Sequence, residues 1–468
     1  MSKIKFGTDG WRAIIADEFT VANVARVAEG TALWLKSRHE NPEIVLGHDC
    51  RFGGRLFCET IAKVMSVYGI KTSMSHGFVS TPMISLGAVQ LNKDLGIIIT
   101  ASHNPPAYNG FKLKGAFGGP LQPAFVAEIE ELIPDQCSID LGKVEFDALE
   151  GSGAVEFVDL ETRYCDHVKA HFDLDSIQSS GLRLAYDAMY GAGQNVMKRL
   201  LPYITFLHCD YNPSFMGQAP EPIHKNLSEF SDLIRTDGKI DSGLVTDGDA
   251  DRLGFYDSHG HFIDSHHIIL LLIHYLCKYK GLKGKVCTAF STTPKVEKLA
   301  RHYGLEVETV KIGFKFIAEI MLKEDVLLGG EESGGIAIKG HIPERDGIWM
   351  GLTLWEFMAK SGKTLNDLIE EIYEIVGRFA FERNDLHIRE EIKQKVLANC
   401  KAGSYKAFGE FNVVRTDDLD GFKYFFNNSD WLLIRASGTE PVLRTYAEAS
   451  TAEGANRILL AARETFLA

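Results

Sequence analysis

A short apolar run that ends in a stiff polar loop constrains the fold of this chain more than any other stretch. Residues 95–99 read Leu-Gly-Ile-Ile-Ile and have the length and composition of a buried strand. Residues 100–112 follow with the sequence Thr-Ala-Ser-His-Asn-Pro-Pro-Ala-Tyr-Asn-Gly-Phe-Lys. Two consecutive prolines and an Asn-Gly pair interrupt regular structure and stiffen this loop. The pattern places Ser102 at the end of a strand, and a rigid backbone there suits this serine to carry a covalent group. A plain turn is the alternative interpretation of any one of these residues.

Helices and short buried strands alternate along most of the chain. The apolar spacing of residues 20–35 is helical, with Thr20 as an N-cap candidate, and residues 44–47 have the pattern of a strand. Alternation of this kind predicts α/β domains with mixed, mostly parallel sheets. A length of 468 residues exceeds one ordinary hydrophobic core. We therefore expect three α/β domains and a final α+β domain, with boundaries at 1–150, 151–257, 258–376 and 377–468.

The composition is that of a soluble globular protein, with 45% apolar and 24% charged residues. The net charge of -13 argues against general binding to nucleic acid or to an anionic membrane, and we expect neither as a partner. It does not exclude an anionic small molecule, because a local cluster of Arg and Lys can outweigh the overall charge. The sequence carries no signal that specifies the oligomeric state.

The cysteines and the N-terminus indicate the compartment. The eight cysteines are scattered and none forms a Cys-x-x-Cys pair, which argues against a zinc site and against a disulfide framework. The chain begins Met-Ser-Lys-Ile-Lys-Phe-Gly and lacks the apolar core of a signal peptide there. The longest apolar run, residues 268–276, is too short to span a bilayer and contains His274. We therefore expect a protein of the reducing cytoplasm.

A second strand-to-loop junction carries three aspartates. The strand-like run Leu-Val-Thr is followed by Asp-Gly-Asp-Ala-Asp-Arg. The carboxylates of Asp247, Asp249 and Asp251 converge on one side of an extended loop and offer the hard oxygen ligands that suit Mg²⁺. An EF-hand calcium loop is excluded, since Arg252 and Ser258 stand where it needs Gly and Glu. A solvated acidic turn is the remaining alternative.

A third junction joins Val-Leu-Leu, residues 326–328, to Gly-Gly-Glu-Glu-Ser-Gly-Gly. Glu331 and Ser333 lie two positions apart on an extended loop, so their side chains point the same way and can hold neighbouring sugar hydroxyls. A glycine-rich turn is the alternative. Upstream, Lys-Ile-Gly-Phe-Lys at 311–315 begins a helix, and its lysines are equally compatible with a solvated helix N-terminus.

Two arginine-containing segments complete the set. Residues 435–441 read Arg-Ala-Ser-Gly-Thr-Glu-Pro and precede Arg444, so that hydroxyls, backbone N–H groups and two arginines form an anion cradle. Residues 6–12 read Phe-Gly-Thr-Asp-Gly-Trp-Arg, and the two glycines allow close approach of the backbone. An exposed turn is the alternative in both places.

These segments, in this order, resemble the motifs of the α-D-phosphohexomutases, the family of phosphoglucomutases and phosphomannomutases. The resemblance runs from residue 6 to residue 444 and implies four domains around a central cleft. It implies that Ser102 is phosphorylated in the resting enzyme and donates this phosphoryl group to a hexose phosphate. A hexose 1,6-bisphosphate then forms, turns over and returns its other phosphate to Ser102. Mg²⁺ is expected on Asp247, Asp249, Asp251 and the phosphorylated Ser102.

The resemblance also implies roles for the remaining side chains. The groups expected at the reacting phosphoryl are Ser102, His103, Lys112, Arg12 and His341, and Lys112 and the two histidines are the candidates for moving the hydroxyl proton. The residues expected to bind the substrate are Arg252, Gly313, Lys315, Glu331, Ser333 and Arg345. The phosphate that does not react is expected at Arg435, Ser437, Gly438, Thr439 and Arg444.

Three positions depart from the family pattern. His48 stands where Arg is usual, and Gly335 stands where some bacterial relatives carry His. Arg345 stands where phosphoglucomutases often carry Lys, and a guanidinium is a poor proton donor because it stays charged. The segment 341–347 otherwise resembles the phosphoglucomutase form, so we expect glucose 1-phosphate as the preferred substrate.

Other activities fit the same residues. Glucose and mannose differ at the 2-hydroxyl, whereas Glu331 and Ser333 are expected at the 3- and 4-hydroxyls, so a phosphomannomutase or a mutase of dual specificity is the first alternative. A glucose 1,6-bisphosphate synthase would use the same parts. A metal-dependent phosphatase could use the serine and the carboxylates but would not need the sugar loop or the distal phosphate anchor. A binding protein without activity would show a damaged motif, and the nucleophile, metal and phosphate motifs are intact.

Overall fold

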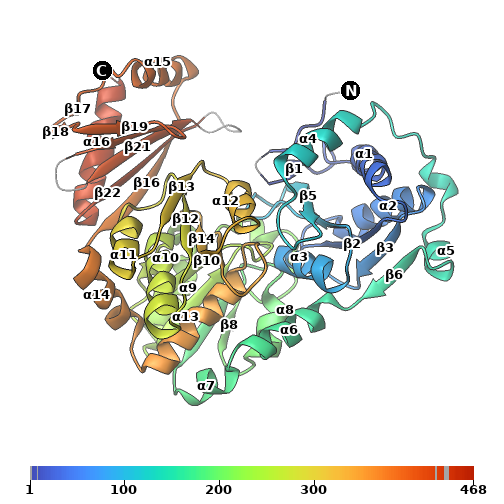
Figure 1. The fold of residues 1–468 in the computed structure, drawn as a ribbon, viewed down its shortest axis with the longest axis horizontal. Helices are drawn as coiled ribbons and strands as arrows, with labels where there is room; N and C mark the ends of the chain where they lie inside the picture. The colour runs from blue at the N-terminus through green and yellow to red at the C-terminus, as the bar shows by residue number, and fades with distance from the viewer. Residues whose placement is uncertain (1–2, 8, 427–429, 437–441, 468) are drawn as a thin grey trace.

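The computed structural model describes residues 3–7, 9–426, 430–436 and 442–467, which form four consecutive units. Figure 1 shows the first and last units at opposite ends of the molecule, with the second and third units between them. The sheets of the first three units mix parallel and antiparallel strands, and the main sheet of the last unit is antiparallel. The fold class predicted from the sequence is confirmed.

The first unit has one sheet with strand order β1-β5-β4-β2-β3-β6, covered by helices on both faces. Its elements are β1 (Trp11–Ile14), α1 (Val21–Arg38), β2 (Glu43–His48), α2 (Gly54–Val67), β3 (Lys71–Ser75), α3 (Thr81–Gln90), β4 (Leu95–Ile99), β5 (Tyr108–Gly115), α4 (Pro123–Leu132), α5 (Phe146–Gly151) and β6 (Val155–Val158). All of β4 is buried, because Ile97 packs with α1 and α2 while Ile98 packs with α3 on the opposite face. The Thr20 hydroxyl accepts a hydrogen bond from the Asn23 N–H and caps α1, as predicted.

The second and third units share the largest hydrophobic core of the molecule. The second sheet has strand order β11-β10-β9-β7-β8, and the third has β13-β12-β14-β15. The second unit contains α6 (Leu160–His171), α7 (Leu174–Ser179), β7 (Leu184–Asp187), α8 (Gln194–Leu200), β8 (Thr205–Leu207), α9 (Ser228–Asp237), β9 (Ser242–Thr246), β10 (Leu253–Asp257) and β11 (Phe262–Ile263). The third contains α10 (Ser265–His274), β12 (Lys285–Ala289), α11 (Lys295–Tyr303), β13 (Val307–Val310), α12 (Phe314–Met321), β14 (Val326–Gly330), β15 (Ile336–Ile338), α13 (Gly347–Ser361) and α14 (Leu365–Val376).

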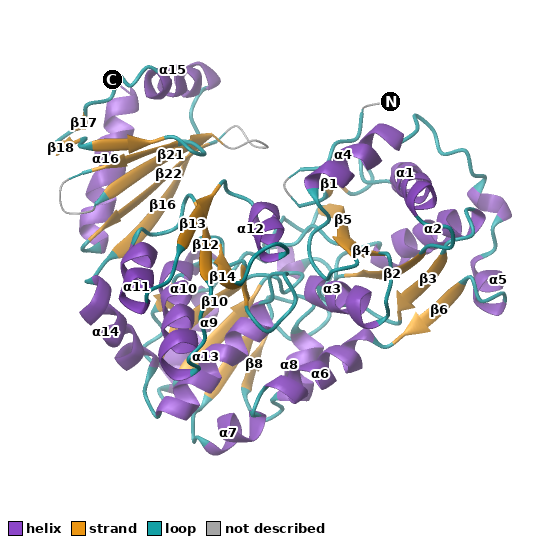
Figure 2. Ribbon diagram, in the orientation of Figure 1, coloured by secondary structure: helices purple, strands orange, loops and turns teal. Residues whose placement is uncertain are grey.

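The last unit is a five-stranded sheet with strand order β16-β22-β21-β20-β19 and helices on one face (Figure 2). Its elements are β16 (Ala380–Leu386), α15 (Glu390–Lys401), β17 (Ala407–Phe408), β18 (Phe411–Asn412), β19 (Arg415–Asp417), β20 (Phe422–Phe425), β21 (Trp431–Ala436), β22 (Leu443–Ala449) and α16 (Ala452–Leu467). Leu432 and Ile434 of β21 pack against α16, whereas Trp431 and Leu433 point the other way and pack against Phe290 of the third unit. The face of this sheet that α16 does not cover therefore packs against the third unit.

Two units extend beyond the boundaries expected from the sequence. β6 pairs with β3 and adds a strand to the first sheet beyond residue 150. β11 pairs with β10 and adds a strand to the second sheet beyond residue 257. These edge strands have four and two residues, which is too short for a periodic pattern to show.

Among the described residues, no helix is long and apolar enough to cross a membrane. All eight cysteines are unpaired, and seven of them are buried.

Candidate active site

Loops from the ends of β4, β9 and β14 meet at one place and carry three of the predicted motifs. The loops after β4 and β9 touch closely, because a Cβ added to Gly248 would lie 2.5 Å from the carbonyl oxygen of Ser102. The loops after β9 and β14 are joined by a β-bridge between Arg252 and Gly335 and by a 3.2 Å hydrogen bond from the Leu253 N–H to the Gly334 carbonyl. Tertiary packing thus brings three loops into a single site. They are the serine loop after β4 (residues 100–107), the aspartate loop after β9 (247–252) and the sugar loop after β14 (331–335).

Ser102 is held in a backbone conformation that is rare for a residue with a side chain. Its φ is +51°, and its N–H donates a 2.9 Å hydrogen bond to the Thr100 hydroxyl. The Ser102 hydroxyl donates a 2.6 Å hydrogen bond to Asp247, and the Nδ1 atom of His103 lies 3.4 Å from the same oxygen. These contacts aim the hydroxyl at the aspartate loop.

Arg51 fixes the backbone of the serine loop through its carbonyl groups, and this role was not predicted from the sequence. Its buried guanidinium donates hydrogen bonds of 2.6 to 3.0 Å to the carbonyls of Ser102, Asn104, Pro105 and Tyr108. Asp49 lies 3.3 Å from the Nε atom of Arg51 and accepts a 2.5 Å hydrogen bond from the Thr100 hydroxyl. The available signal was the Asp-Cys-Arg sequence that directly follows the buried strand β2.

The three aspartates fit a divalent cation. One carboxylate oxygen from each of Asp247, Asp249 and Asp251 lies within 4.8 Å of the others, and all three side chains are fully buried. The Oδ1 atoms of Asp249 and Asp251 are buried without a hydrogen-bond partner among the described residues. Burial, together with the negative charges of Asp249 and Asp251, raises the pKa of Asp247 well above its usual value. A cation among these oxygens would remove both the unpaired acceptors and the repulsion.

Lys112 is fixed as a positive charge at the edge of this cluster. Its Nζ atom lies 2.8 Å from Asp249, 3.2 Å from Asp251 and 2.9 Å from Asp9. Burial opposes the charged form, but these three carboxylates hold the pKa of Lys112 above its usual value. Such an amine stays protonated near neutral pH, so it donates a proton more readily than it accepts one, and the part of Lys112 in moving the hydroxyl proton stays a prediction.

The two candidate histidines lie in different surroundings. Burial, and the positive charges of Arg252 and Arg12, lower the pKa of His103 well below its usual value, so its imidazole is neutral at pH 7. The His341 side chain is fully buried, stacks on Trp349 at a ring distance of 3.8 Å and contacts Asp346 at 2.9 Å. This packing holds His341 in the core, and the acid/base role expected for it stays a prediction.

Two predicted arginines face the serine loop. Arg12 donates a 2.8 Å hydrogen bond to the Asn104 side chain, two residues from Ser102. The Nε atom of Arg252 is buried and has no hydrogen-bond partner in the described part of the chain, and it lies 4.0 Å from Asp251. Both guanidiniums therefore bring positive charge to the serine and aspartate loops.

The sugar loop is organised by Glu331 and Arg345. Glu331 is 5% exposed and accepts a 3.0 Å hydrogen bond from the Gly313 N–H. Burial raises the pKa of Glu331 to about 7, although Arg345 opposes this shift. Arg345 contacts Asp9 and lies 2.8 Å from Asp251, so it joins the first and second units. A Cβ on Gly335 would lie 2.5 Å from the Arg345 side chain, so the two departures from the family pattern depend on each other.

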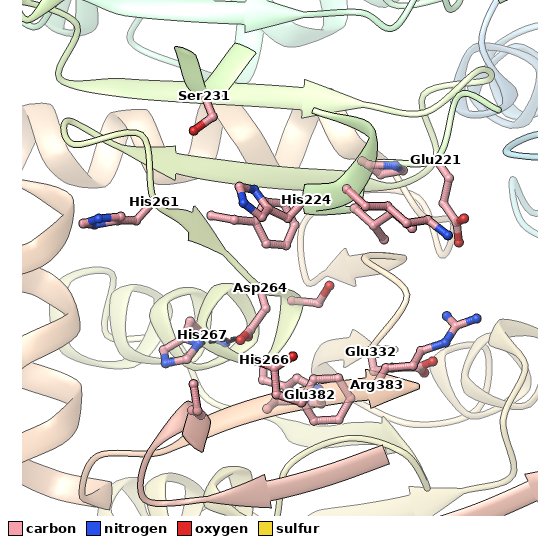
Figure 3. Close-up of a pocket in the computed structure, with 18 of the residues that line it drawn as sticks. Glu221, His224, Ser231, His261, Asp264, His266, His267, Glu332, Glu382 and Arg383 are labelled. Carbon is pink, nitrogen blue, oxygen red and sulfur yellow. Dashed lines mark hydrogen bonds and ion pairs between the residues drawn. The ribbon is translucent and has the colours of Figure 1, made fainter. Parts of the chain in front are cut away.

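A cavity of about 1330 Å³ opens beside the sugar loop. Figure 3 shows Glu332 and Arg383 on one side of it and His224 of the second unit on the other. Ser333, one of the side chains predicted to bind the substrate, also lines this cavity, whereas Lys315, another of them, lines a smaller cavity with Asp9. The larger cavity gives the sugar loop an open side bounded by the second, third and last units.

The last unit contributes paired arginines. Arg435 and Arg444 are directly opposite each other on β21 and β22, although like charges at paired strand positions repel. Arg435 contacts both carboxylate oxygens of Asp420 at 3.3 Å. The other residues expected at the phosphate, Ser437, Gly438 and Thr439, lie outside the described residues. A bound phosphate would reduce the repulsion between the two arginines.

Comparisons with known proteins cover almost the whole chain. Four Phosphoglucomutase/phosphomannomutase family models match it in order: α/β/α domain I at residues 3–138, domain II at 162–260, domain III at 264–376 and the C-terminal domain at 391–465. The chain is similar to a phosphoglucomutase/phosphomannomutase of Thermococcus kodakarensis, with 30% identity over 97% of this chain and 96% of the relative. It is also similar to a phosphoglucosamine/phosphogalactosamine mutase of Sulfurisphaera tokodaii, with 29% identity over 97% of each chain. The structure of a Thermus thermophilus protein assigned as a phosphomannomutase is 33% identical, covers 100% of both chains and has a TM-score of 0.88.

Proposed function

This chain belongs to the phosphoglucomutase/phosphomannomutase family and is a phosphohexomutase, and from that premise we propose that it interconverts glucose 1-phosphate and glucose 6-phosphate through a phosphoserine at Ser102. The observation that carries the proposal is the 2.6 Å hydrogen bond from the Ser102 hydroxyl to Asp247, inside the buried aspartate cluster. This contact puts the nucleophile beside the charges that phosphoryl transfer requires.

In the proposed reaction, the phosphoryl group of Ser102 passes to the free hydroxyl of a hexose phosphate. The bond from phosphorus to Ser102 breaks as the bond to the sugar oxygen forms, and the hydroxyl proton passes to the neutral imidazole of His103. That imidazole, whose Nδ1 atom lies 3.4 Å from the Ser102 hydroxyl oxygen, then gives a proton to the departing Ser102 oxygen. Arg12, Lys112 and Arg252 hold positive charge around the transferred group. The resulting hexose 1,6-bisphosphate turns over and returns its other phosphate to Ser102.

Asp247, Asp249 and Asp251 would hold Mg²⁺, with the phosphorylated Ser102 as a further ligand. The Oδ1 atoms of Asp249 and Asp251, for which the described part of the chain offers no hydrogen-bond partner, support this assignment. When bound, the cation supplies neutralisation of the phosphoryl oxygens as charge shifts during transfer. Lys112 and Arg345 both form ion pairs with the Oδ2 atom of Asp251, and these contacts stabilise the conformation of the aspartate loop.

Substrate recognition is proposed at the opposite side of the site. Glu331 and Ser333 would accept hydrogen bonds from the sugar 3- and 4-hydroxyls, and Gly313, Lys315 and Arg345 would support that loop. Arg435 and Arg444, with Ser437, Gly438 and Thr439, would anchor the phosphate that does not react. Anchoring a remote group in this way orients the reacting end of the substrate.

Glucosamine 1-phosphate is a second candidate substrate. Several relatives that cover most of this chain are phosphoglucosamine mutases, at 26 to 29% identity. The 2-position distinguishes glucose, mannose and glucosamine, and Glu331 and Ser333 are assigned to other hydroxyls. The phosphoglucomutase-like segment 341–347 favours glucose among the three sugars.

Phosphorus NMR tests the proposal directly. Purified protein is incubated with Mg²⁺, a trace of glucose 1,6-bisphosphate, and the 1-phosphate of glucose, mannose, glucosamine or N-acetylglucosamine. We expect the glucose 6-phosphate resonance to appear fastest and to be absent with Ser102→Ala. Accumulation of inorganic phosphate in place of the 6-phosphate would instead identify a phosphatase.

A further inference from the structure

The turn between β19 and β20 connects the proposed phosphate anchor to the third unit. Asp420 in this turn accepts a 2.8 Å hydrogen bond from the backbone N–H of Ile312. The same carboxylate contacts the Nε and Nη2 atoms of Arg435, each at 3.3 Å. One side chain of the last unit thus joins a loop of the third unit to an arginine of its own sheet.

The surrounding backbone holds Asp420 in this position. Gly421 has a φ of +100°, and a Cβ there would lie 2.7 Å from the carbonyl oxygen of Ile434, the residue before Arg435. The turn therefore rests directly on β21. Two residues further, the buried Nζ atom of Lys423 donates hydrogen bonds of 3.1 Å and 2.9 Å to the carbonyls of Phe290 and Thr292 in the third unit. The turn is consequently fixed both to its own sheet and to its neighbour.

The loop that Asp420 reaches is also bound from its other side. The N–H of Ile312 donates to Asp420, and the next N–H, that of Gly313, donates a 3.0 Å hydrogen bond to Glu331. Two adjacent peptide groups therefore connect a carboxylate of the sugar loop to a carboxylate of the last unit. A continuous chain of hydrogen bonds and one peptide linkage thus runs from Arg435 through Asp420, Ile312 and Gly313 to Glu331.

We propose that Asp420 is a positioning residue that couples the phosphate anchor at Arg435 to the sugar loop at Glu331. This inference rests on the proposed function of these two sites. Hydrogen bonds to a charged carboxylate are stronger than neutral ones, so Asp420 fixes the separation of the two binding groups before substrate arrives. Arg435 and Glu331 then already lie at the spacing that a hexose phosphate requires. Binding of the substrate therefore loses no further conformational entropy in ordering these two side chains.

Asp420→Ala tests the coupling, and Asp418→Ala is the matched control, because Asp418 is an exposed aspartate of the same turn. The dissociation constant of glucose 1-phosphate is measured by calorimetry on the full-length protein. We expect Asp420→Ala to raise this constant about tenfold, which is about 1.4 kcal/mol, and Asp418→Ala to leave it within a factor of about two. Asp420→Glu, which retains the charge, should recover part of the loss.

A double-mutant cycle separates positioning from general stability. If Asp420 acts through Arg435, removing Asp420 in an Arg435→Ala background should weaken glucose 1-phosphate binding less than about twofold further. Equal and independent losses in the two backgrounds would overturn the coupling. Thermal unfolding of each variant shows whether a fall in affinity merely follows a fall in stability.

Hydrogen exchange reports on the bridge without any ligand. The amide of Ile312 should exchange faster in Asp420→Ala than in the Asp418→Ala control, because it loses its acceptor. If Asp420→Ala leaves either the exchange of the Ile312 amide or the affinity for glucose 1-phosphate unchanged, the inference is wrong. The proposed function is unaffected by that result as long as the wild type shows mutase turnover. Absence of turnover in the wild type, with the expected pattern of affinities retained, overturns the proposed function instead.

Discussion

The hydroxyl of Ser102 donates a 2.6 Å hydrogen bond to Asp247, a residue 145 positions later in the chain and in the next unit. The proposed nucleophile and the proposed cation site are therefore completed only when the first two units pack together. The close approach of Gly248 to the Ser102 carbonyl makes that packing specific, since a larger residue at 248 would push the two loops apart.

Ser102 should carry the exchangeable phosphoryl group. Intact mass spectrometry of the purified protein should show one added phosphate, and fragmentation should locate it at Ser102. Ser102→Ala should lack this mass and should lose mutase turnover, because alanine has no hydroxyl at the strand end to accept the phosphoryl group. Ser66→Ala, at the end of α2, is the control and should keep both. Normal turnover in Ser102→Ala would exclude the assignment.

Asp247→Asn should lower kcat by about a hundredfold or more, because the transferred charge loses a counter-ion ligand in a buried site. The variant should also lose the stabilisation that a bound cation gives to the native state. Thermal unfolding with and without Mg²⁺ measures this second effect independently of turnover. Full wild-type activity in excess chelator, or an equal rise in Tm for both proteins, would rule out the cation site.

Arg51→Lys should lower kcat while leaving the KM for glucose 1-phosphate within about twofold. A lysine ammonium is a point charge and cannot reach the four carbonyls that the planar guanidinium holds, so Ser102 loses its fixed orientation. Buried carbonyls left without donors should also lower the Tm. Arg55→Lys is the control, because it keeps the charge of a half-buried arginine that pairs with Glu59 within α2. An unchanged kcat in Arg51→Lys would show that the clamp is dispensable.

Glu331 should make the protein less stable as the pH rises. Its pKa is raised from 4.5 to about 7 in the folded chain, chiefly by burial, so the native state keeps a proton that the unfolded state has lost. Between these values the free energy of unfolding should fall by at most about 1.4 kcal/mol per pH unit from this group. Glu331→Gln should lack this contribution, and Glu306→Gln, at an exposed position, should retain it. Chemical denaturation from pH 5 to pH 8 measures the difference, and identical pH profiles for wild type and Glu331→Gln would contradict it.

The ratio of kcat/KM for glucose 1-phosphate to that for mannose 1-phosphate should favour glucose modestly. No group at the 2-hydroxyl is assigned among the proposed sugar contacts, so the large penalty of an unpaired buried partner should not apply. Steady-state kinetics with both sugars provides the ratio. A preference for mannose of tenfold or more, about 1.4 kcal/mol in transition-state binding, would reassign the preferred substrate and leave the mechanism unchanged.

The chain alone determined the features that depend on near neighbours in sequence. The buried strand before Ser102, the N-cap at Thr20 and the aspartate spacing from 247 to 251 all follow from local patterns of polarity and turn residues. For this reason the α/β class and the positions of the motifs could be predicted, whereas the short edge strands β6 and β11 could not.

Tertiary structure decided which charges meet. Lys112 lies 137 positions from Asp249, and its surrounding carboxylates make it a fixed cation. This outcome cannot be obtained from spacing, because a pKa depends on burial and on charges that only folding brings within a few ångströms. The clamp of Arg51 and the bridge of Asp420 have the same origin, since both act on backbone groups that a sequence does not display.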